Sequence, residues 1–74
     1  MESLDYFGAN LRDYRKSQGL TQTELAKRLD VGSVYLSQLE AGSRAPSAGM
    51  MVAVAAALGC TVTDLLAPPK KGKP

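Results

Sequence analysis

Four residues between positions 33 and 38 combine side-chain types and spacing that suit recognition through hydrogen bonds and an apolar contact. They are Ser33, Val34, Ser37 and Gln38. Residues three and four apart share one side of a helix, so these side chains project together if Leu36 and Leu39 face inward. A glutamine amide can bond an adenine edge twice, a serine hydroxyl can donate or accept, and valine can contact a thymine methyl. If this helix faces DNA, the residues predicted to contact bases are Gln38, Ser33 and Val34, with Ser37 beside them.

The neighbouring Tyr35 is open to two interpretations. Its long ring and hydroxyl can reach a base or a phosphate, and we include it among the candidate base-reading residues. Alternatively, it packs at the rim over the preceding helix.

The chain contains no histidine and a single cysteine, Cys60, which limits the available chemistry. A structural zinc site needs about four Cys or His ligands. Nucleophilic catalysis needs a nucleophile with an adjacent base, and the sequence offers no such pair. We therefore expect a protein that is not an enzyme and that needs no metal or cofactor. Cys60 is expected to be a buried small apolar side chain.

Capping signals around residues 20–46 predict two short helices joined by a tight turn. Thr21 and Glu24 have the spacing of a capping box, so a helix begins at about Gln22. Residues 30–32 interrupt the apolar periodicity, and a second helix follows until Gly42 ends it. Two helices in this arrangement suit the reading of double-stranded DNA.

The same signals predict three further helices. The first starts after Ser3, which can cap it, and ends before Gly19. The fourth follows Ser47 and ends at Gly59, and a second capping-box spacing precedes a short fifth helix over residues 62–66. The sequence has no period-two run of β-branched residues, so the fold class is all-α.

The chain length of 74 residues allows one small domain. We assign residues 1–67 to this domain and residues 68–74, which include two consecutive prolines, to a flexible Pro- and Lys-rich tail. The start of the chain lacks the basic and apolar regions of a signal peptide. The longest apolar run, residues 48–58, is far shorter than the roughly 20 residues that span a bilayer. A soluble, cytoplasmic protein without a membrane partner is expected.

Net charge gives no independent support for binding nucleic acid. The formal charge is +2, but Lys70, Lys71 and Lys73 lie in the last five residues, and the rest of the chain has six basic and seven acidic residues. The tail can attract phosphates without regard to sequence, can simply solubilise the chain, or can be a linker to another domain.

Five blocks of sequence, in order, resemble the helix-turn-helix domain of phage-repressor and Cro-like proteins, the XRE family, over about residues 7–66. The blocks are Asn10 to Lys16, Gly19 to Gln22 with Glu24 to Ala26, Leu36 to Glu40 with Gly42, Pro46-Ser47, and Ala57 to Gly59 with Asp64 to Leu66. The resemblance implies a compact five-helix, lambda-repressor-like fold. In that fold the second helix lies across the DNA backbone and the start of the third enters the major groove.

The resemblance also implies contacts with the DNA backbone. Gln22, with Thr21, lies at the start of the second helix, where free amides and the helix dipole favour a phosphate. Ser43 and Arg44, just past the third helix, resemble a second phosphate clamp. Four other basic residues remain open between phosphate contacts and ordinary solvated charges. These are Arg12, Lys16, Lys27 and Arg28.

Four positions matter for the fold rather than for binding. Arg15 and Glu40 correspond to an internal ion pair of the family, which ties the first helix to the end of the third. Between the second and third helices, Asp30 occupies a place where glycine is common, because the turn needs a left-handed backbone that Asp tolerates better than most residues. Gly32 then replaces the usual Ser or Thr cap at a small cost.

The fourth helix departs most from the family pattern because residues 48–58 include no polar side chain. Its core face is expected to be Met51, Val54, Ala55 and Leu58. The surplus apolar residues Met50, Val52, Ala53 and Ala57 are expected to form a homodimer interface. Alternatively, they are mostly alanines that can stay exposed at little cost.

Together these observations predict a sequence-specific double-stranded DNA-binding transcriptional regulator, of bacterial or phage origin, without a small-molecule ligand. A homodimer would bind an inverted repeat with half-sites about 10 bp apart or a multiple of that. The alternative is an antitoxin-like or other protein-interaction module that uses the same fold.

Overall fold

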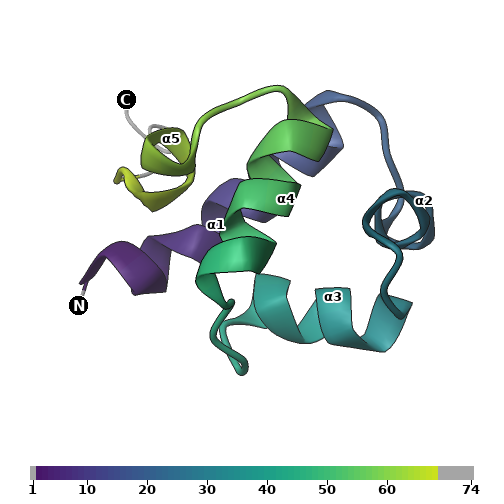
Figure 1. Cartoon of the computed structure of the whole chain (residues 1–74), viewed down its shortest axis with the longest axis horizontal. Coiled ribbons are helices and arrows are strands. Elements are labelled where there is room, and N and C mark those ends of the chain that lie inside the picture. The colour runs from purple at the N-terminus through teal and green to yellow at the C-terminus, as the bar shows by residue number, and fades with distance from the viewer. Residues whose placement is uncertain (1, 69–74) are drawn as a thin grey trace.

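Five α-helices joined by short turns make up the part of the chain that the computed structural model describes, residues 2–68, with side chains from residue 6 onward (Figure 1). The helices are α1 (Glu2–Ser17), α2 (Gln22–Leu29), α3 (Ser33–Ala41), α4 (Ala48–Leu58) and α5 (Val62–Leu66). No strand occurs in this part of the chain, so the predicted all-α fold is confirmed. The proposed tail lies outside the described residues, apart from Pro68.

The helices begin where the capping signals predicted, with one exception. Thr21 and Glu24 form a complete capping box at α2, and an equivalent box precedes α5. The Ser47 hydroxyl accepts a hydrogen bond from the Met50 amide and caps α4. The predicted start of α1 after Ser3 is wrong, because the helix already includes Glu2. An acidic residue in a first turn suits the helix dipole, which favours this earlier start.

Each of the first four helices ends in a residue with left-handed backbone geometry. Gly19, Gly42 and Gly59 have φ values of 71°, 80° and 71°, and Asp30, with φ 59°, is the non-glycine member of the set. The amide one residue later closes the end in every case by donating to a carbonyl five residues back, as Val31 does to Ala26 at 3.0 Å. The expected left-handed turn at Asp30 is therefore present.

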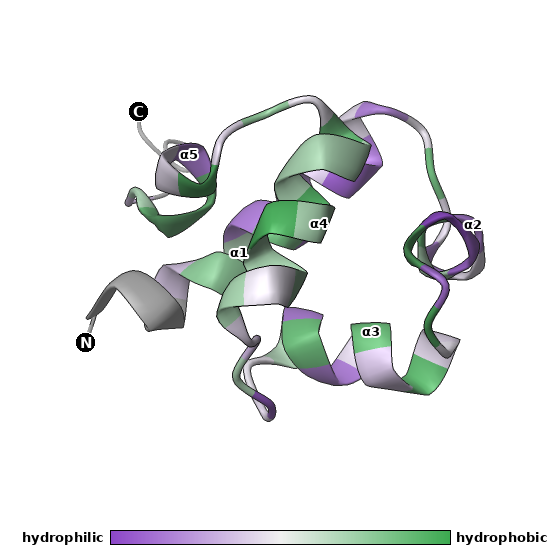
Figure 2. Ribbon diagram, viewed as in Figure 1, coloured by the Kyte–Doolittle hydropathy of each residue, from purple (hydrophilic) through white to green (hydrophobic). Residues whose placement is uncertain are grey.

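The core collects apolar side chains from all five helices. Its buried members are Phe7, Leu11, Leu25, Ala26, Leu36, Leu39, Val54, Ala55, Leu58 and Leu65. Figure 2 shows the apolar residues of α4 running along the middle of the molecule, with the polar residues of α2 at its edge. Cys60 is half-buried and packs against this core, as an apolar side chain would. Among the described residues, no helix is long and apolar enough to cross a bilayer.

Two side chains, one on α1 and one just after it, close the ends of α5 and α4. The buried Asn10 amide donates to the carbonyls of Leu65 and Ala67, both at 2.7 Å, and so holds the end of α5. Gln18 donates to the carbonyl of Leu58 at 2.7 Å, at the end of α4. Carbonyls at a helix end lack partners within the helix, so these bonds satisfy groups that would otherwise need water.

Gly8 sets the distance between α1 and α3. A β-carbon placed there would lie 2.5 Å from the carbonyl oxygen of Leu39 and 2.7 Å from that of Glu40. Only a residue without a side chain permits this approach. The orientation of α3 on α1 therefore depends on this one position.

Candidate nucleic-acid interface

The outer face of α3 presents a row of exposed side chains above a sealed inner face. Leu36 and Leu39 are fully buried, as their spacing predicted. Ser33 and Ser37 are exposed, and 70% of Val34 is open to solvent. Three of the five predicted base-reading residues thus share the solvent-facing side of one helix.

The other two predicted readers, Tyr35 and Gln38, are half-buried and meet Arg44, which lies beyond the end of α3. Arg44 Nε donates to Gln38 Oε1 at 3.1 Å, and its guanidinium carbon lies 5.4 Å from the centre of the Tyr35 ring. Ser43 Oγ donates to the backbone carbonyl of Gln38 at 3.4 Å. We call Tyr35, Gln38 and Arg44 the α3 cluster. In this cluster Arg44, which was predicted to contact the DNA backbone, contacts two residues that were predicted to contact bases.

Glu40 joins three helices through one carboxylate. Arg15 Nε donates to Oε2 at 2.6 Å and its Nη2 to Oε1 at 3.0 Å, with 10% and 5% of the two side chains exposed. Arg15 Nη1 also donates to the carbonyl of Leu20 at 2.7 Å. Gln22 Nε2 donates to Oε1 at 3.0 Å. The ion pair expected from the family resemblance is formed, and Gln22 was not foreseen as its third member.

The bond to Glu40 changes the expected role of Gln22. One of its two amide hydrogens is occupied, so the side chain keeps one donor for a phosphate. Thr21 is engaged as well, because its hydroxyl accepts from the Glu24 amide at 3.0 Å. The hydrogen bond that the Thr21 amide donates to Glu24 lowers the pKa of that carboxyl. These contacts fix the N-terminal end of α2, whose dipole favours an anion.

A hollow of about 270 Å³ lies beside this helix end, between α1, α2 and α3. Its lining consists of Arg12, Arg15, Lys16, Gln22, Ser37, Glu40 and Ala41. Three of these side chains are cationic, and two of them, Arg12 and Lys16, are exposed and separate from the ion pair. The sequence left Arg12 and Lys16 open between phosphate contacts and ordinary solvated charges. The structure places both of them next to Gln22 and to Ser37 on the outer face of α3. Lys27 and Arg28 are exposed on α2 and do not line this hollow.

The expected dimer surface on α4 is smaller than the sequence suggested. Val52 is 60% exposed, but Met50, Ala53 and Ala57 are half-buried, and Met50 and Ala57 pack against the core. The expectation that all four are surplus to the core is therefore wrong for Met50 and Ala57. The helix α4 packs against α1, α2 and α5, so it buries more of its circumference than a single stripe.

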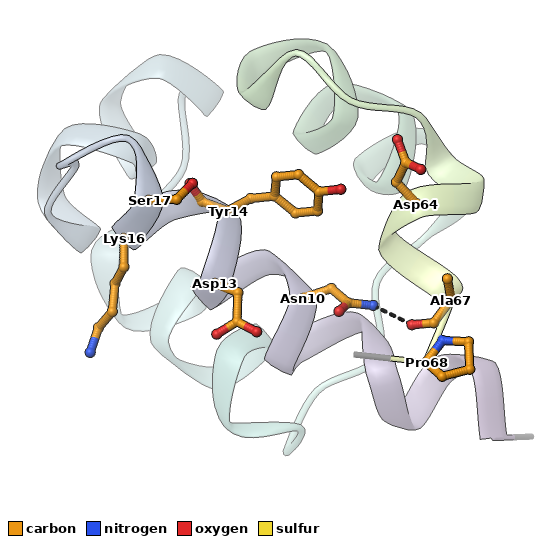
Figure 3. A pocket seen from close by; sticks show the side chains of 8 residues that line it. All are labelled: Asn10, Asp13, Tyr14, Lys16, Ser17, Asp64, Ala67 and Pro68. Atoms are coloured by element: carbon orange, nitrogen blue, oxygen red, sulfur yellow. Dashed lines mark hydrogen bonds between the residues drawn. The ribbon is translucent and has the colours of Figure 1, made fainter. Parts of the chain in front are cut away.

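A second hollow, of about 490 Å³, lies between α1 and α5 (Figure 3). Its lining consists of Asn10, Asp13, Tyr14, Lys16, Ser17, Asp64, Ala67 and Pro68. Burial, together with the nearby negative charge of Asp64, raises the pKa of the Tyr14 hydroxyl. Apart from Lys16, which lines both hollows, none of the residues considered for DNA contacts lines this one. Among the described residues, no group of His, Cys, Asp and Glu side chains is placed to hold a metal ion.

Comparison with known proteins decides the family. The helix-turn-helix family model HTH_3 matches residues 11–65, which include all of α2 to α4, the second part of α1 and most of α5. The chain belongs to the HTH_3 helix-turn-helix family. This HTH_3 protein has the DNA-binding fold of transcriptional regulators, which are not enzymes.

Three relatives illustrate the range of the family. The chain is 37% identical over 67 residues to the uncharacterized HTH-type transcriptional regulator YazB of Bacillus subtilis, covering 90% of this chain and 96% of YazB. It is 43% identical over 60 residues to a propionyl-CoA carboxylase regulator of Cereibacter sphaeroides, but spans only 13% of that protein. The crystal structure of the clp gene regulator ClgR from C. glutamicum has a TM-score of 0.80 and 39% identity, covering 86% of this chain and 83% of ClgR.

Besides the bond from Gln22 to Glu40, sequence reasoning missed three contacts of the HTH_3 chain that position its helices or the side chains of α3. They are the close approach at Gly8, the double hydrogen bond from Asn10 and the contact of Arg44 with Gln38. A glycine within the apolar-patterned first helix was a usable signal for Gly8, because glycine is unfavourable there without a packing reason. The other two contacts join residues whose neighbours in space follow from no local pattern.

Proposed function

We propose that this chain is a sequence-specific double-stranded DNA-binding transcriptional regulator that reads base edges in the major groove with the outer face of α3. The observation that supports this most directly is the exposed row Ser33, Val34 and Ser37 above the buried Leu36 and Leu39. Helices of this width fit the major groove, and amide, hydroxyl and methyl groups match the donors, acceptors and thymine methyls found there.

Backbone contacts follow from the cationic hollow next to this face. Arg12, Lys16 and the remaining Gln22 donor would hold one phosphate at the N-terminal end of α2. Ser43 and Arg44 would approach a second phosphate beyond the end of α3. Such contacts set the position of α3 on the duplex, while the base contacts set the sequence.

The decisive experiment selects bound duplexes from a random pool at two salt concentrations, and then compares the wild type with Gln38→Ala. If α3 reads bases, the wild type should select one preferred sequence. Gln38→Ala should then lose about 1–3 kcal/mol of binding free energy, and its sequence preference should relax at one base pair only. Arg28→Ala is the matched control, because Arg28 is exposed on α2 and outside the hollow, so the preference should be unchanged. Selection of no sequence at either salt would contradict the proposal.

We further propose that the chain binds an inverted repeat as a homodimer through α4, with Val52 at the centre of the contact and Ala53 beside it. The 60% exposure of Val52 supports this surface. Two domains of low net charge that bind DNA together gain affinity, because binding of the first raises the effective concentration of the second. This gain offsets the low charge of each domain. Sedimentation should show a dimer that Val52→Asp dissociates. A strict monomer at tens of micromolar, or selected sites without two-fold symmetry, would contradict it.

An antitoxin-like module is the alternative use of the fold. It predicts stable co-purification with one partner protein and weak, salt-dependent binding to every duplex. The Val52→Asp variant would then lose the partner and keep the weak binding.

A further inference from the structure

Arg44 lies folded back over α3 and makes two different contacts there. Its Nε donates to Gln38 Oε1 at 3.1 Å, and its guanidinium carbon lies 5.4 Å from the centre of the Tyr35 ring. The distance to the ring is within the range of a cation–π contact. Tyr35 is half-buried and packs against the core, so its ring is a fixed support for the guanidinium. The α3 cluster therefore holds the Gln38 side chain from one side.

The contact determines which way the Gln38 amide points. Guanidinium N–H groups only donate hydrogen bonds, so the group that faces Arg44 must be the amide oxygen. The amide nitrogen, with both of its hydrogens, is then turned away from Arg44. A glutamine without such a partner can exchange the places of oxygen and nitrogen by a half-turn of its last bond.

We propose that Arg44 is a positioning residue for sequence recognition, because it fixes the order of oxygen and nitrogen that Gln38 presents to a base. The proposal rests on the proposed function of α3 in base readout. Bonding an adenine edge needs the amide nitrogen at N7 and the amide oxygen at the N6 amino group. A reversed amide would bring oxygen against the N7 acceptor. Oε1 has a second lone pair, so it can accept from Arg44 and from a base together.

This role differs from that of a phosphate clamp. A phosphate contact strengthens binding to every duplex by a similar factor and carries no sequence information. A positioning residue changes the preference at a single base pair and acts only when the side chain it holds is present. The two roles therefore predict different outcomes for the same substitution.

Arg44→Lys provides the test because it keeps the positive charge and removes the planar guanidinium. Equilibrium binding is measured on the duplex selected by the wild type and on duplexes altered at the base pair that Gln38 reads. In Arg44→Lys the Gln38 side chain is free before binding, so binding must order it at the cost of immobilising one flexible side chain. The preference for the selected base pair at that position should therefore fall about 2- to 12-fold. Preferences at the other base pairs should stay unchanged. Arg28→Lys, the same exchange at an exposed position of α2 outside the cationic hollow, is the matched control and should leave all preferences unchanged.

Gln38→Ala and the double variant separate the possible failures. If Gln38→Ala changes no preference, base readout by Gln38 is wrong and the proposed function fails at this residue. If Gln38→Ala abolishes a preference that Arg44→Lys leaves intact, or if Arg44→Lys weakens all duplexes equally, the positioning role is overturned. In the Gln38→Ala background, Arg44→Lys should have no further effect on that preference.

A measurement without DNA checks the same contact in the free protein. The two side-chain amide protons of Gln38 should give distinct, shifted NMR signals in the wild type that move toward free-glutamine values in Arg44→Lys. Tyr35→Phe keeps the ring and should leave these signals in place. Unchanged signals in Arg44→Lys would overturn the positioning role, and circular dichroism verifies that each variant is folded.

Discussion

Replacing Gly8 by alanine tests the close approach of α1 and α3. The new β-carbon would lie 2.5 Å and 2.7 Å from two backbone carbonyl oxygens, where ordinary contact begins at 3.4 Å. Backbone atoms cannot rotate away as a side chain can, so the two helices must separate by roughly 1 Å. Forcing an extra group into a packed interior costs about 1–3 kcal/mol. The better helix propensity of alanine offsets about 0.5–1 kcal/mol of this cost.

The net expectation for Gly8→Ala is a loss of about 1–2 kcal/mol in the free energy of unfolding. For a domain of this size, the midpoint of thermal unfolding should fall by about 5–15 °C. Urea and thermal unfolding followed by far-UV circular dichroism measure both quantities. Because α3 shifts with the contact, affinity for a selected duplex should fall as well.

Gly49→Ala is the matched control for this experiment. Gly49 also lies in a helix, α4, but a β-carbon there would meet no atom within 4 Å. The same substitution should therefore stabilise the chain by up to about 0.5–1 kcal/mol. If Gly8→Ala is as stable as the wild type, or gains stability as Gly49→Ala does, the reasoning about the helix contact is wrong.

Three further substitutions test the ion pair, the cysteine and the first capping box. Glu40→Ala leaves the buried Arg15 guanidinium without its carboxylate and should lower the free energy of unfolding by about 3–5 kcal/mol, enough to unfold much of the protein. Urea unfolding measures this change. A loss below about 1 kcal/mol would show that the ion pair is effectively solvated. Burial raises the pKa of the Cys60 thiol, so the unfolded chain ionises first and stability should fall as pH rises above about 8.5. Thermal unfolding at pH 7 and pH 9.5 should show a smaller fall for Cys60→Ala, and an equal fall would refute this origin. Thr21→Ala should cost about 1 kcal/mol of stability. It removes the hydroxyl's contribution to the lowered pKa of Glu24 but keeps the larger one from the backbone amide, so an NMR titration should show this pKa rising only partly toward its ordinary range. The stability that comes from this lowered pKa is present above the ordinary carboxyl range and is lost as pH falls through the pKa of Glu24 in the folded protein. If Thr21→Ala leaves acid unfolding unchanged, this contribution is absent.

The helices and their ends were predictable because their signals are local. A capping box needs residues only three apart, and a left-handed helix end needs one tolerant residue, so Thr21, Glu24 and Asp30 could be interpreted without knowledge of the fold. The start of α1 was the exception. Ser3 is a good cap in isolation, but the first turn that includes Glu2 is also favourable, and sequence alone does not weigh the two.

The contacts that shape the candidate interface depend on distances that no local pattern encodes. Gln22 was interpreted as a phosphate ligand, whereas its amide also donates to Glu40, which is 18 residues away in the chain. The extent of apolar surface on α4 was overestimated because residue type alone does not show how much a short helix is surrounded. Met50 and Ala57 pack against the core, which leaves Val52 as the strongly exposed member.

The position of Glu40 has a thermodynamic consequence for association. One carboxylate on α3 is bonded to Arg15 on α1 and to Gln22 on α2, so the three helices that would face a ligand are already locked together in the free protein. Docking then demands no ordering of backbone at the moment of contact. The heat capacity of complex formation should reflect only the apolar area that becomes covered, without the large extra decrease that accompanies coupled folding. Encounter rates would depend on orientation and ionic attraction.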